Sequence, residues 1–287
     1  MIMSDLSRAG KTAEIIKKYG FSFQKRFGQN FLIDEHVLNK ITEAALIGEK
    51  DGVIEIGPGI GTMTQRLCEQ AAKVVAIEID RELMPILSET LSEYDNVKIV
   101  NADVMKTDLE ELIKEDFGGM TVRVVANLPY YITTPIVMAL LEQQLPIESI
   151  TIMVQKEVAE RMQAMPGTKD YGALSLAVQY YADTYIAANV PPNCFMPRPK
   201  VGSCVIRLTV RRSRPVEVKD EKHMFMLIRA AFNQRRKTLA NAIANHPGSG
   251  HTRDEVIEAL KKLGLSETIR GEAMDLGQFA ELSNILT

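Results

Sequence analysis

The sequence predicts an α/β protein in which a mostly parallel sheet of seven strands is followed by a small all-helical domain. Short β-branched apolar runs alternate with amphipathic segments from Gly52 to about Val154. Strands that alternate with helices pair in parallel and carry helices on both faces of the sheet. Beyond residues 211–215 the strand pattern stops and helical periodicity takes over. We therefore place a domain boundary near Arg212, with one domain at 1–211 and a second at 212–287.

Individual elements follow from the same patterns. Five apolar runs predict the central strands, at 53–56, 74–79, 97–100, 122–126 and 150–154. Two further strand-like runs, 184–190 and 203–210, are joined by a proline-rich turn and complete the seven strands. Helices are expected near 63–72, 81–94, 109–115, 134–144 and 157–162. In the second domain we expect helices at 223–232, 236–245, 252–264 and 278–286, the third of which begins with the capping box Thr252-x-x-Glu255.

Composition excludes several classes of protein. Of the 287 residues, 46% are hydrophobic and 25% are charged, which is ordinary for a globular chain and unlike disordered or collagen-like sequences. No apolar run approaches the roughly 18 residues of a membrane helix, and residues 1–20 lack a basic-then-apolar signal pattern. We therefore expect a soluble cytoplasmic protein. The three cysteines, Cys68, Cys194 and Cys204, lack metal-ligand spacing, so we expect neither zinc nor a disulfide framework.

Charge is unevenly distributed along the chain. The net charge is −3, but residues 195–240 contain twelve basic and three acidic residues, which gives this segment +9 and leaves −12 elsewhere. A second basic stretch, 17–27, interleaves cations with aromatic residues, as nucleic-acid contact surfaces do. For either run alone a solvated surface is the simpler interpretation. The presence of both favours contact with nucleic acid, with candidate phosphate-binding residues Arg198, Lys200, Arg235, Arg236 and Lys237.

A glycine loop follows the first strand. Gly57, Gly59 and Gly61 stand between this strand and the next helix, where the backbone can approach a ligand at the helix N-terminus. Glu78 lies at the end of the second strand, where a carboxylate can accept hydrogen bonds from both ribose hydroxyls of a nucleotide. A carboxylate at this position fits NAD as well as S-adenosylmethionine. Asp103 follows the third strand, where it can accept from an adenine amine. Together they predict a site for an adenosine-containing cofactor.

The turn Asn127-Leu128-Pro129-Tyr130 follows the fourth strand, so it faces the same crevice as the glycine loop. An amine on an aromatic ring is a poor nucleophile because its lone pair is delocalised. The side-chain oxygen of Asn127 and the carbonyl of Pro129 can accept hydrogen bonds from the two N–H groups of such an amine and direct its lone pair toward an electrophile. Tyr130 can stack on the ring of a base that has left its helix. This chemistry suits methyl transfer from a sulfonium.

With these residues the chain resembles the bacterial small-subunit (16S) ribosomal RNA adenine N6,N6-dimethyltransferases. The resemblance is carried by motifs in the family's order along most of the chain, namely Phe27-Gly28-Gln29-Asn30-Phe31-Leu32, Glu55-Ile56-Gly57-Pro58-Gly59-Ile60-Gly61, Glu78, Asp103, Asn127-Leu128-Pro129-Tyr130, Phe195-x-Pro197-x-Pro199-Lys200-Val201 and Phe232-x-Gln234-Arg235-Arg236-Lys237. It implies a Rossmann-like S-adenosylmethionine-dependent methyltransferase domain followed by a helical RNA- or ribosome-binding domain.

The resemblance also implies roles for particular residues. Contacts to S-adenosylmethionine would come from Asn30, Leu32, Gly57, Glu78, Asp103 and Asn127, with Gln29 and Gly59 beside them. Asn127, Pro129 and Tyr130 would hold the target adenine. The implied reaction is the dimethylation of two adjacent adenosines in a hairpin near the 3′ end of 16S rRNA in the small ribosomal subunit, during late subunit biogenesis. We expect a monomer that needs no metal.

Three other functions remain open at the level of sequence. A macrolide-resistance methyltransferase acting on 23S rRNA shares the fold and a similar turn, but such enzymes tend to be basic overall. A ribosome-assembly factor could bind RNA with only a vestigial site, although an intact Asn127-Leu128-Pro129-Tyr130 turn argues against this. A dehydrogenase would use the glycine loop for NAD.

Overall fold

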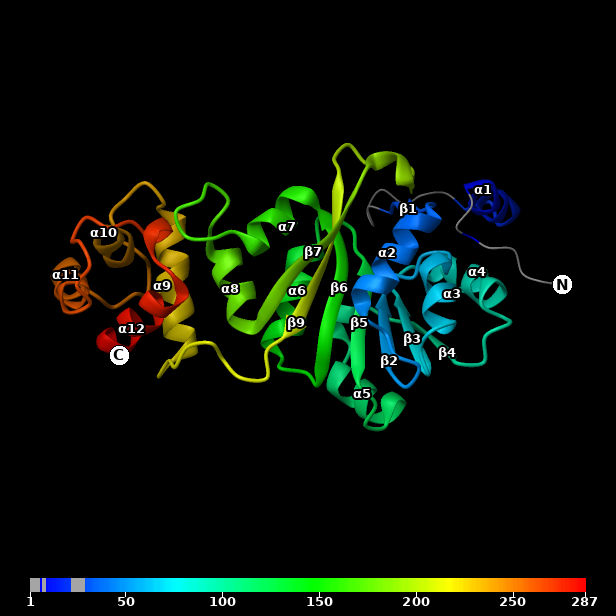
Figure 1. The fold of residues 1–287 in the computed structure, drawn as a ribbon, viewed down its shortest axis with the longest axis horizontal. Coiled ribbons are helices and arrows are strands. Elements are labelled where there is room, and N and C mark those ends of the chain that lie inside the picture. The colour runs from blue at the N-terminus through cyan, green and yellow to red at the C-terminus, as the bar shows by residue number, and fades with distance from the viewer. Residues whose placement is uncertain (1–5, 7–8, 22–28) are drawn as a thin grey trace. The chain divides into compact units, whose positions relative to one another are not determined.

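The computed structural model describes residue 6, residues 9–21 and residues 29–287. Within them the chain divides into two compact units (Figure 1). The first unit comprises Met1–Ala159 and Thr184–Val210, and the second comprises Glu160–Asp183 and Arg211–Thr287. No helix in the described part of the chain is long and apolar enough to cross a membrane.

A seven-stranded sheet forms the centre of the first unit, in the order β4-β3-β2-β5-β6-β9-β7. Its strands are β2 (Gly52–Ile56), β3 (Lys73–Glu78), β4 (Val97–Asn101), β5 (Val122–Asn127), β6 (Ile147–Gln155), β7 (Ala182–Val190) and β9 (Ser203–Val210). The first five strands of that order pair in parallel, and β9 pairs antiparallel with β6. Every residue of β2 is buried, as expected for a strand covered on both faces. The predicted mostly parallel, seven-stranded sheet is confirmed.

A separate two-stranded sheet connects distant parts of the sequence. β1 (Phe31–Leu32) pairs antiparallel with β8 (Phe195–Met196), with Phe31 opposite Met196. This pairing brings the segment before the first central strand next to the proline-rich turn before β9.

Helices of the first unit lie between the strands and before β2. They are α1 (Ala9–Lys18), α2 (Glu35–Ala45), α3 (Thr62–Cys68), α4 (Met84–Thr90), α5 (Leu109–Phe117), α6 (Thr133–Glu142) and the start of α7 (Lys156–Gln163). Asp34 caps α2 by accepting from the Val37 amide, and Leu38 packs with Leu67 of α3 in one buried cluster with the sheet. α1 lies beside α4 (Figure 1), where Lys18 pairs with Glu89.

The second unit contains α8 (Ala173–Tyr181), α9 (Glu221–Asn233), α10 (Leu239–Ala244), α11 (Arg253–Lys262) and α12 (Leu276–Leu286). The predicted capping box at Thr252 and Glu255 is present at the start of α11. The Tyr180 hydroxyl of α8 donates to Glu221 of α9 at 2.7 Å, and the Arg214 guanidinium lies 4.7 Å from the Tyr181 ring centroid. These contacts hold α8 against α9.

The compact units differ from the predicted domains in one respect, because the unit that contains Arg211–Thr287 also contains residues 160–183, which the prediction assigned to the first domain. The helix predicted at 81–94 is a 3-10 turn at Arg81–Leu83 followed by the shorter α4, which has a proline in its first turn. α1, α2 and α8 were not predicted from the sequence.

Candidate functional site

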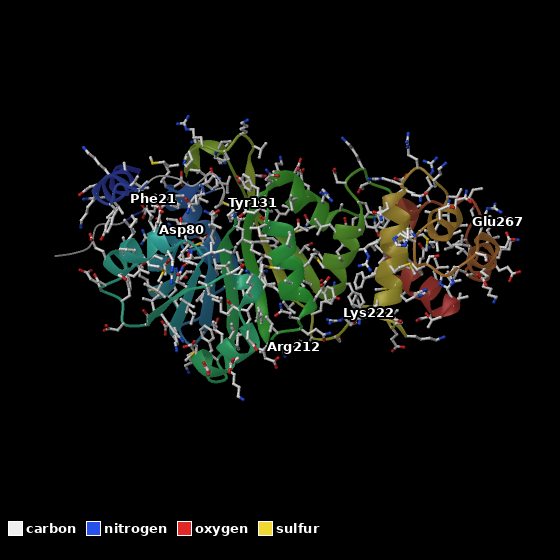
Figure 2. The ribbon with its side chains drawn as sticks, turned by 180° about the vertical axis from the view of Figure 1, so that it is seen from behind. Phe21, Asp80, Tyr131, Arg212, Lys222 and Glu267 are labelled. Carbon is white, nitrogen blue, oxygen red and sulfur yellow. The ribbon has the colours of Figure 1, made fainter. Side chains whose placement is uncertain are left out.

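A cavity of about 460 Å³ lies in the first unit at the carboxyl ends of β2, β3, β4 and β5. Figure 2 labels Asp80 and Tyr131, which follow β3 and β5 at this edge of the sheet. Every residue expected to bind the cofactor or the target base lines this cavity, namely Gln29, Asn30, Leu32, Gly57, Gly59, Glu78, Asp103, Asn127, Pro129 and Tyr130. The structure therefore brings the expected cofactor-binding residues and the expected base-binding residues together in one cavity.

The glycine loop adopts a backbone that side chains disfavour. Gly57, Gly59 and Gly61 have φ angles of 72°, 63° and 91°. A Cβ on Gly59 would lie 3.0 Å from the Phe31 ring, and one on Gly61 would lie 2.9 Å from the Thr90 hydroxyl. Gly59 thus lets the loop approach residues 29–32, which contain β1 and are called the β1 segment below, and Gly61 lets α3 begin against α4.

Glu78 is a buried carboxylate that holds the loop in place. Its two oxygens accept from the Gly59 amide at 3.1 Å and from the Asp80 amide at 2.9 Å. Burial raises the pKa of Glu78 to about 7, and these two amide bonds partly oppose that rise. The carboxylate is therefore poised between its charged and neutral forms near physiological pH.

Asp103 and Gln29 are fixed by local hydrogen bonds. One Asp103 oxygen accepts from the Met105 amide at 3.0 Å, at the start of a 3-10 turn after β4, and the Lys106 ammonium lies 3.9 Å from the other oxygen. The Gln29 amide donates to the Asp80 carboxylate at 2.9 Å. Gln29 thus lines the cavity and also joins the β1 segment to Asp80, whose backbone amide donates to Glu78.

Asn127 is oriented by the same β1 segment. Its side-chain Nδ2 donates to the backbone carbonyl of Asn30 at 3.2 Å. Since the amide nitrogen is committed to this bond, the opposite atom, Oδ1, is the acceptor left over, and no described residue donates to it. Asn127 can therefore accept a hydrogen bond from a ligand.

Pro129 is less available than the sequence suggested. Its carbonyl already accepts from the Thr133 hydroxyl at 3.1 Å and from the Ile132 amide at 3.1 Å, and both bonds belong to the start of α6. A carbonyl oxygen has two lone pairs, so a bond to a target amine must share or replace one of these interactions. Tyr130 is half-buried, and its hydroxyl lies 2.8 Å from the Ser203 hydroxyl.

Glu55 is a site residue to which the sequence analysis assigned no role. It lies on β2, lines the cavity, and has no exposed surface. By distance and angle neither carboxylate oxygen forms a hydrogen bond with a described residue, although the nearby Thr64 hydroxyl of α3 partly opposes the rise in the Glu55 pKa. The Thr62 hydroxyl of α3 is also unpaired among the described residues. Burial raises the pKa of Glu55 to about 8. Its place two residues before Gly57, inside the motif, was the signal that could have identified it.

The expected phosphate-binding residues fall into separate units. Arg198 and Lys200 are exposed in the first unit, and Arg236 and Lys237 are exposed in the second. Arg235 pairs with Glu272 at 2.7 Å and donates to the Thr168 carbonyl, so protein groups already bind its guanidinium. Within the expected basic stretch 17–27, residues 22–27 lie outside the described residues, as do Phe27 and Gly28 of the first motif. Among described residues no cluster of His, Cys, Asp and Glu could hold a metal ion.

Close relatives in sequence share the whole length of the chain. A protein from Lachnoclostridium phytofermentans named Ribosomal RNA small subunit methyltransferase A is 61% identical over 285 residues, which cover 99% of this chain and 98% of that protein. A protein of the same name from Geobacillus thermodenitrificans is 53% identical over 284 residues, covering 98% of this chain and 97% of that protein.

Solved structures and a family model lead to the same group. A dimethyladenosine transferase from Plasmodium falciparum is similar with a TM-score of 0.74 and 27% identity, covering 88% of this chain and 95% of that chain. The 23S rRNA methyltransferase ErmE is similar with a TM-score of 0.67 and 27% identity, covering 90% and 99%. A family model for ribosomal RNA adenine dimethylases matches residues 20–287. This chain therefore belongs to the ribosomal RNA adenine dimethylase family.

Proposed function

We propose that this protein uses S-adenosylmethionine to dimethylate the N6 amines of two adjacent adenosines in a hairpin near the 3′ end of the small-subunit (16S) ribosomal RNA. The observation that carries the proposal is the available Oδ1 of Asn127, which lines one cavity together with Glu78, Asp103 and Tyr130. Such a reaction needs an acceptor that orients the target amine, carboxylates that bind the adenosine of the cofactor, and an aromatic ring that stacks on the target base.

The cavity fits the cofactor. Glu78 would accept from the ribose hydroxyls and Asp103 from the adenine amine, beside Gly57 and Gly59 in the wall of the same cavity. Glu55 is a buried acidic group beside the glycine loop, and neither of its oxygens has a hydrogen-bond partner among the described residues, so it would accept from a polar group of the cofactor. When bound, the cofactor supplies an electrophilic methyl group on a sulfonium.

The protein's own task is to orient the nucleophile. Asn127 Oδ1 accepts one N–H of the target amine, and the Pro129 carbonyl accepts the other by sharing one of its present bonds. The amine lone pair is then directed out of the ring plane toward the methyl group. Tyr130 stacks on the adenine after it has left the RNA stack. No general base among the described residues is needed, because the methylated nitrogen loses its proton to solvent.

RNA contact is assigned to exposed cations outside the cavity. Arg198 and Lys200 in the first unit and Arg236 and Lys237 in the second supply phosphate contacts. Arg235 contributes by holding the 234–237 segment through its pair with Glu272. We propose that the protein acts as a monomer in the cytoplasm and needs no metal.

The runner-up function is methylation of 23S rRNA, as the likeness to ErmE allows. Sequence identity favours the small subunit, because the relatives at 50–61% identity carry the small-subunit name whereas ErmE is 27% identical. An assembly factor without catalysis is disfavoured, because the groups described above line one cavity.

The test is to incubate the purified protein and S-adenosylmethionine with small and large ribosomal subunits that lack dimethyladenosine, and to map the product by mass spectrometry. We expect two adjacent dimethyladenosines in the small-subunit RNA only. Methylation confined to large-subunit RNA would establish the runner-up. An unmodified RNA with retained subunit binding would establish the assembly factor.

A further inference from the structure

The hydroxyl of Tyr130 has a single partner in the described structure, Ser203. The two oxygens are 2.8 Å apart, and Ser203 has only 1% of its surface exposed. Burial also raises the pKa of the Tyr130 hydroxyl, so the phenol stays protonated and can take part in this bond as donor or acceptor. The sequence analysis assigned no role to Ser203.

Ser203 is held rigidly by the sheet. It is the first residue of β9 and lies opposite Gln155 at the end of β6. The Lys156 amide donates to the Gly202 carbonyl at 3.0 Å, which extends the strand pairing beyond Ser203. The serine hydroxyl is therefore fixed at the edge of the sheet where the cavity lies.

Tyr130 is held differently at its two ends. Its backbone lies in the turn between β5 and α6, which is fixed by Pro129 and by the bond from the Ile132 amide to the Pro129 carbonyl. Its ring is half-buried and lines the cavity, where rotation about two side-chain torsions would change the face offered to a base. The bond to Ser203 removes this freedom, because it fixes the far end of the ring.

We propose that Ser203 is a positioning residue that holds the Tyr130 ring in the orientation that captures the target adenine. This inference rests on the proposed function. A Tyr130 ring that is already held in the stacking orientation loses less conformational entropy when the flipped base enters the site. The free-energy barrier to methyl transfer is lower as a result. Ser203 itself does not contact the base.

A double-mutant cycle tests the proposal with Ser203→Ala, Tyr130→Phe and the double variant. The assay is single-turnover methyl transfer to small subunits at saturating S-adenosylmethionine and saturating subunit. Each single variant should lower the rate by about 3- to 10-fold, as expected for loss of one hydrogen bond, and the double variant should be no slower than either. Affinities for the cofactor and for the subunit should stay within about twofold of wild type, because phosphate contacts and Glu78 are untouched.

Ser149→Ala is the matched control. Ser149 is also a serine with 1% exposure on the same sheet, and it accepts from Arg123 at 3.2 Å, away from the cavity. This variant loses a comparable buried hydrogen bond, yet its methylation rate should stay within about twofold of wild type.

The outcomes separate this inference from the proposed function. If wild-type protein methylates the RNA and Ser203→Ala is equally fast, or if Ser203→Ala slows the reaction equally in the presence and absence of Tyr130→Phe, the inference alone is wrong. If Ser203→Ala does not fold, Tyr130→Phe removes the same bond from the other side, and an unchanged rate there overturns the inference. A wild-type protein with no activity on any RNA overturns the proposed function first.

Discussion

Glu55→Gln should change how the stability of the cofactor-free protein depends on pH. In the folded protein Glu55 is completely buried, and neither carboxylate oxygen has a partner among the described residues. Burial raises its pKa to about 8, whereas an unfolded chain has a glutamate pKa near 4.5. Because the folded pKa is the higher one, folding is favoured while Glu55 is protonated, and this contribution is lost as pH rises from about 4.5 to 8.

The magnitude follows from the size of the shift. Each unit of pKa difference corresponds to about 1.4 kcal/mol, so between pH 5 and pH 8 wild type should lose about 3 kcal/mol of unfolding free energy that Glu55→Gln does not lose. Glutamine keeps the shape of the side chain and has no charge to bury. The variant should therefore match wild type near pH 5 and exceed it at pH 8.

Urea unfolding at pH 5, 6, 7 and 8 without cofactor measures this difference. Glu142→Gln on the exposed surface of α6 is the control and should follow the wild-type pH dependence. Glu78 also has a raised pKa and contributes in the same direction in all three proteins. Its charge adds to the rise of the Glu55 pKa, so this repulsion is part of the difference that the comparison measures. Parallel curves for wild type and Glu55→Gln would refute the reasoning, since Glu55 would then ionise inside the fold at little cost.

Three further predictions concern the proposed function. Asn127→Ala should lower the single-turnover methylation rate by about 10²–10³ while subunit binding is retained, since a preorganised acceptor for the amine is lost, and a near-normal rate would contradict that role. S-adenosylmethionine should bind about tenfold more weakly at pH 6 than at pH 8, because Glu78, with a pKa of about 7, must be ionised to accept hydrogen bonds from the ribose. Calorimetry across this pH range measures the affinity, and an affinity that does not change with pH would contradict ribose recognition by Glu78. Replacing Arg236 and Lys237 by Ala should reduce the dependence of subunit affinity on salt concentration and leave thermal stability unchanged. Arg235→Ala should instead lower the melting temperature, because it breaks the ion pair with Glu272. If the salt dependence of the double variant equals that of wild type, Arg236 and Lys237 are ordinary solvated residues.

The centre of the sheet could be predicted because strands such as β2, β3 and β6 are buried along most of their length. β2 and β5 are short, mostly apolar runs rich in β-branched residues, interrupted only by Glu55 in β2 and by Arg123 in β5 before its final Asn127, and such a pattern can be recognised from local sequence. α8 was harder, because its sequence Ala173–Tyr181 is apolar on most sides and leads directly into β7 at Ala182 without a turn signal. Its assignment to the second unit depends on long-range contacts such as the hydrogen bond from the Tyr180 hydroxyl to Glu221 of α9, which no local pattern reveals.

The cavity residues differ in the same way. Glu78, Asp103 and Asn127 follow successive parallel strands, so their meeting at one edge of the sheet follows from topology alone. Asn30 reaches the cavity only because β1 pairs with β8, whose residues lie more than 160 positions later in the chain. Local sequence patterns could not place it, and only the family resemblance suggested its role.

The hydrogen bonds of the cavity indicate a site that is formed before any ligand enters. Glu78 at the end of β3 accepts from the Gly59 amide of the glycine loop, and the Asn30 carbonyl accepts from Asn127 at the end of β5, so each of these side chains is fixed by a neighbouring segment. Each of these side chains keeps acceptor capacity for a ligand, because a carboxylate oxygen can accept more than one bond and Asn127 Oδ1 accepts none from the described residues. Cofactor and base would then add bonds to an existing framework rather than replace its bonds. Pro129 is the exception: its carbonyl already accepts two bonds at the start of α6, so a bond from the target amine must share or replace one of them.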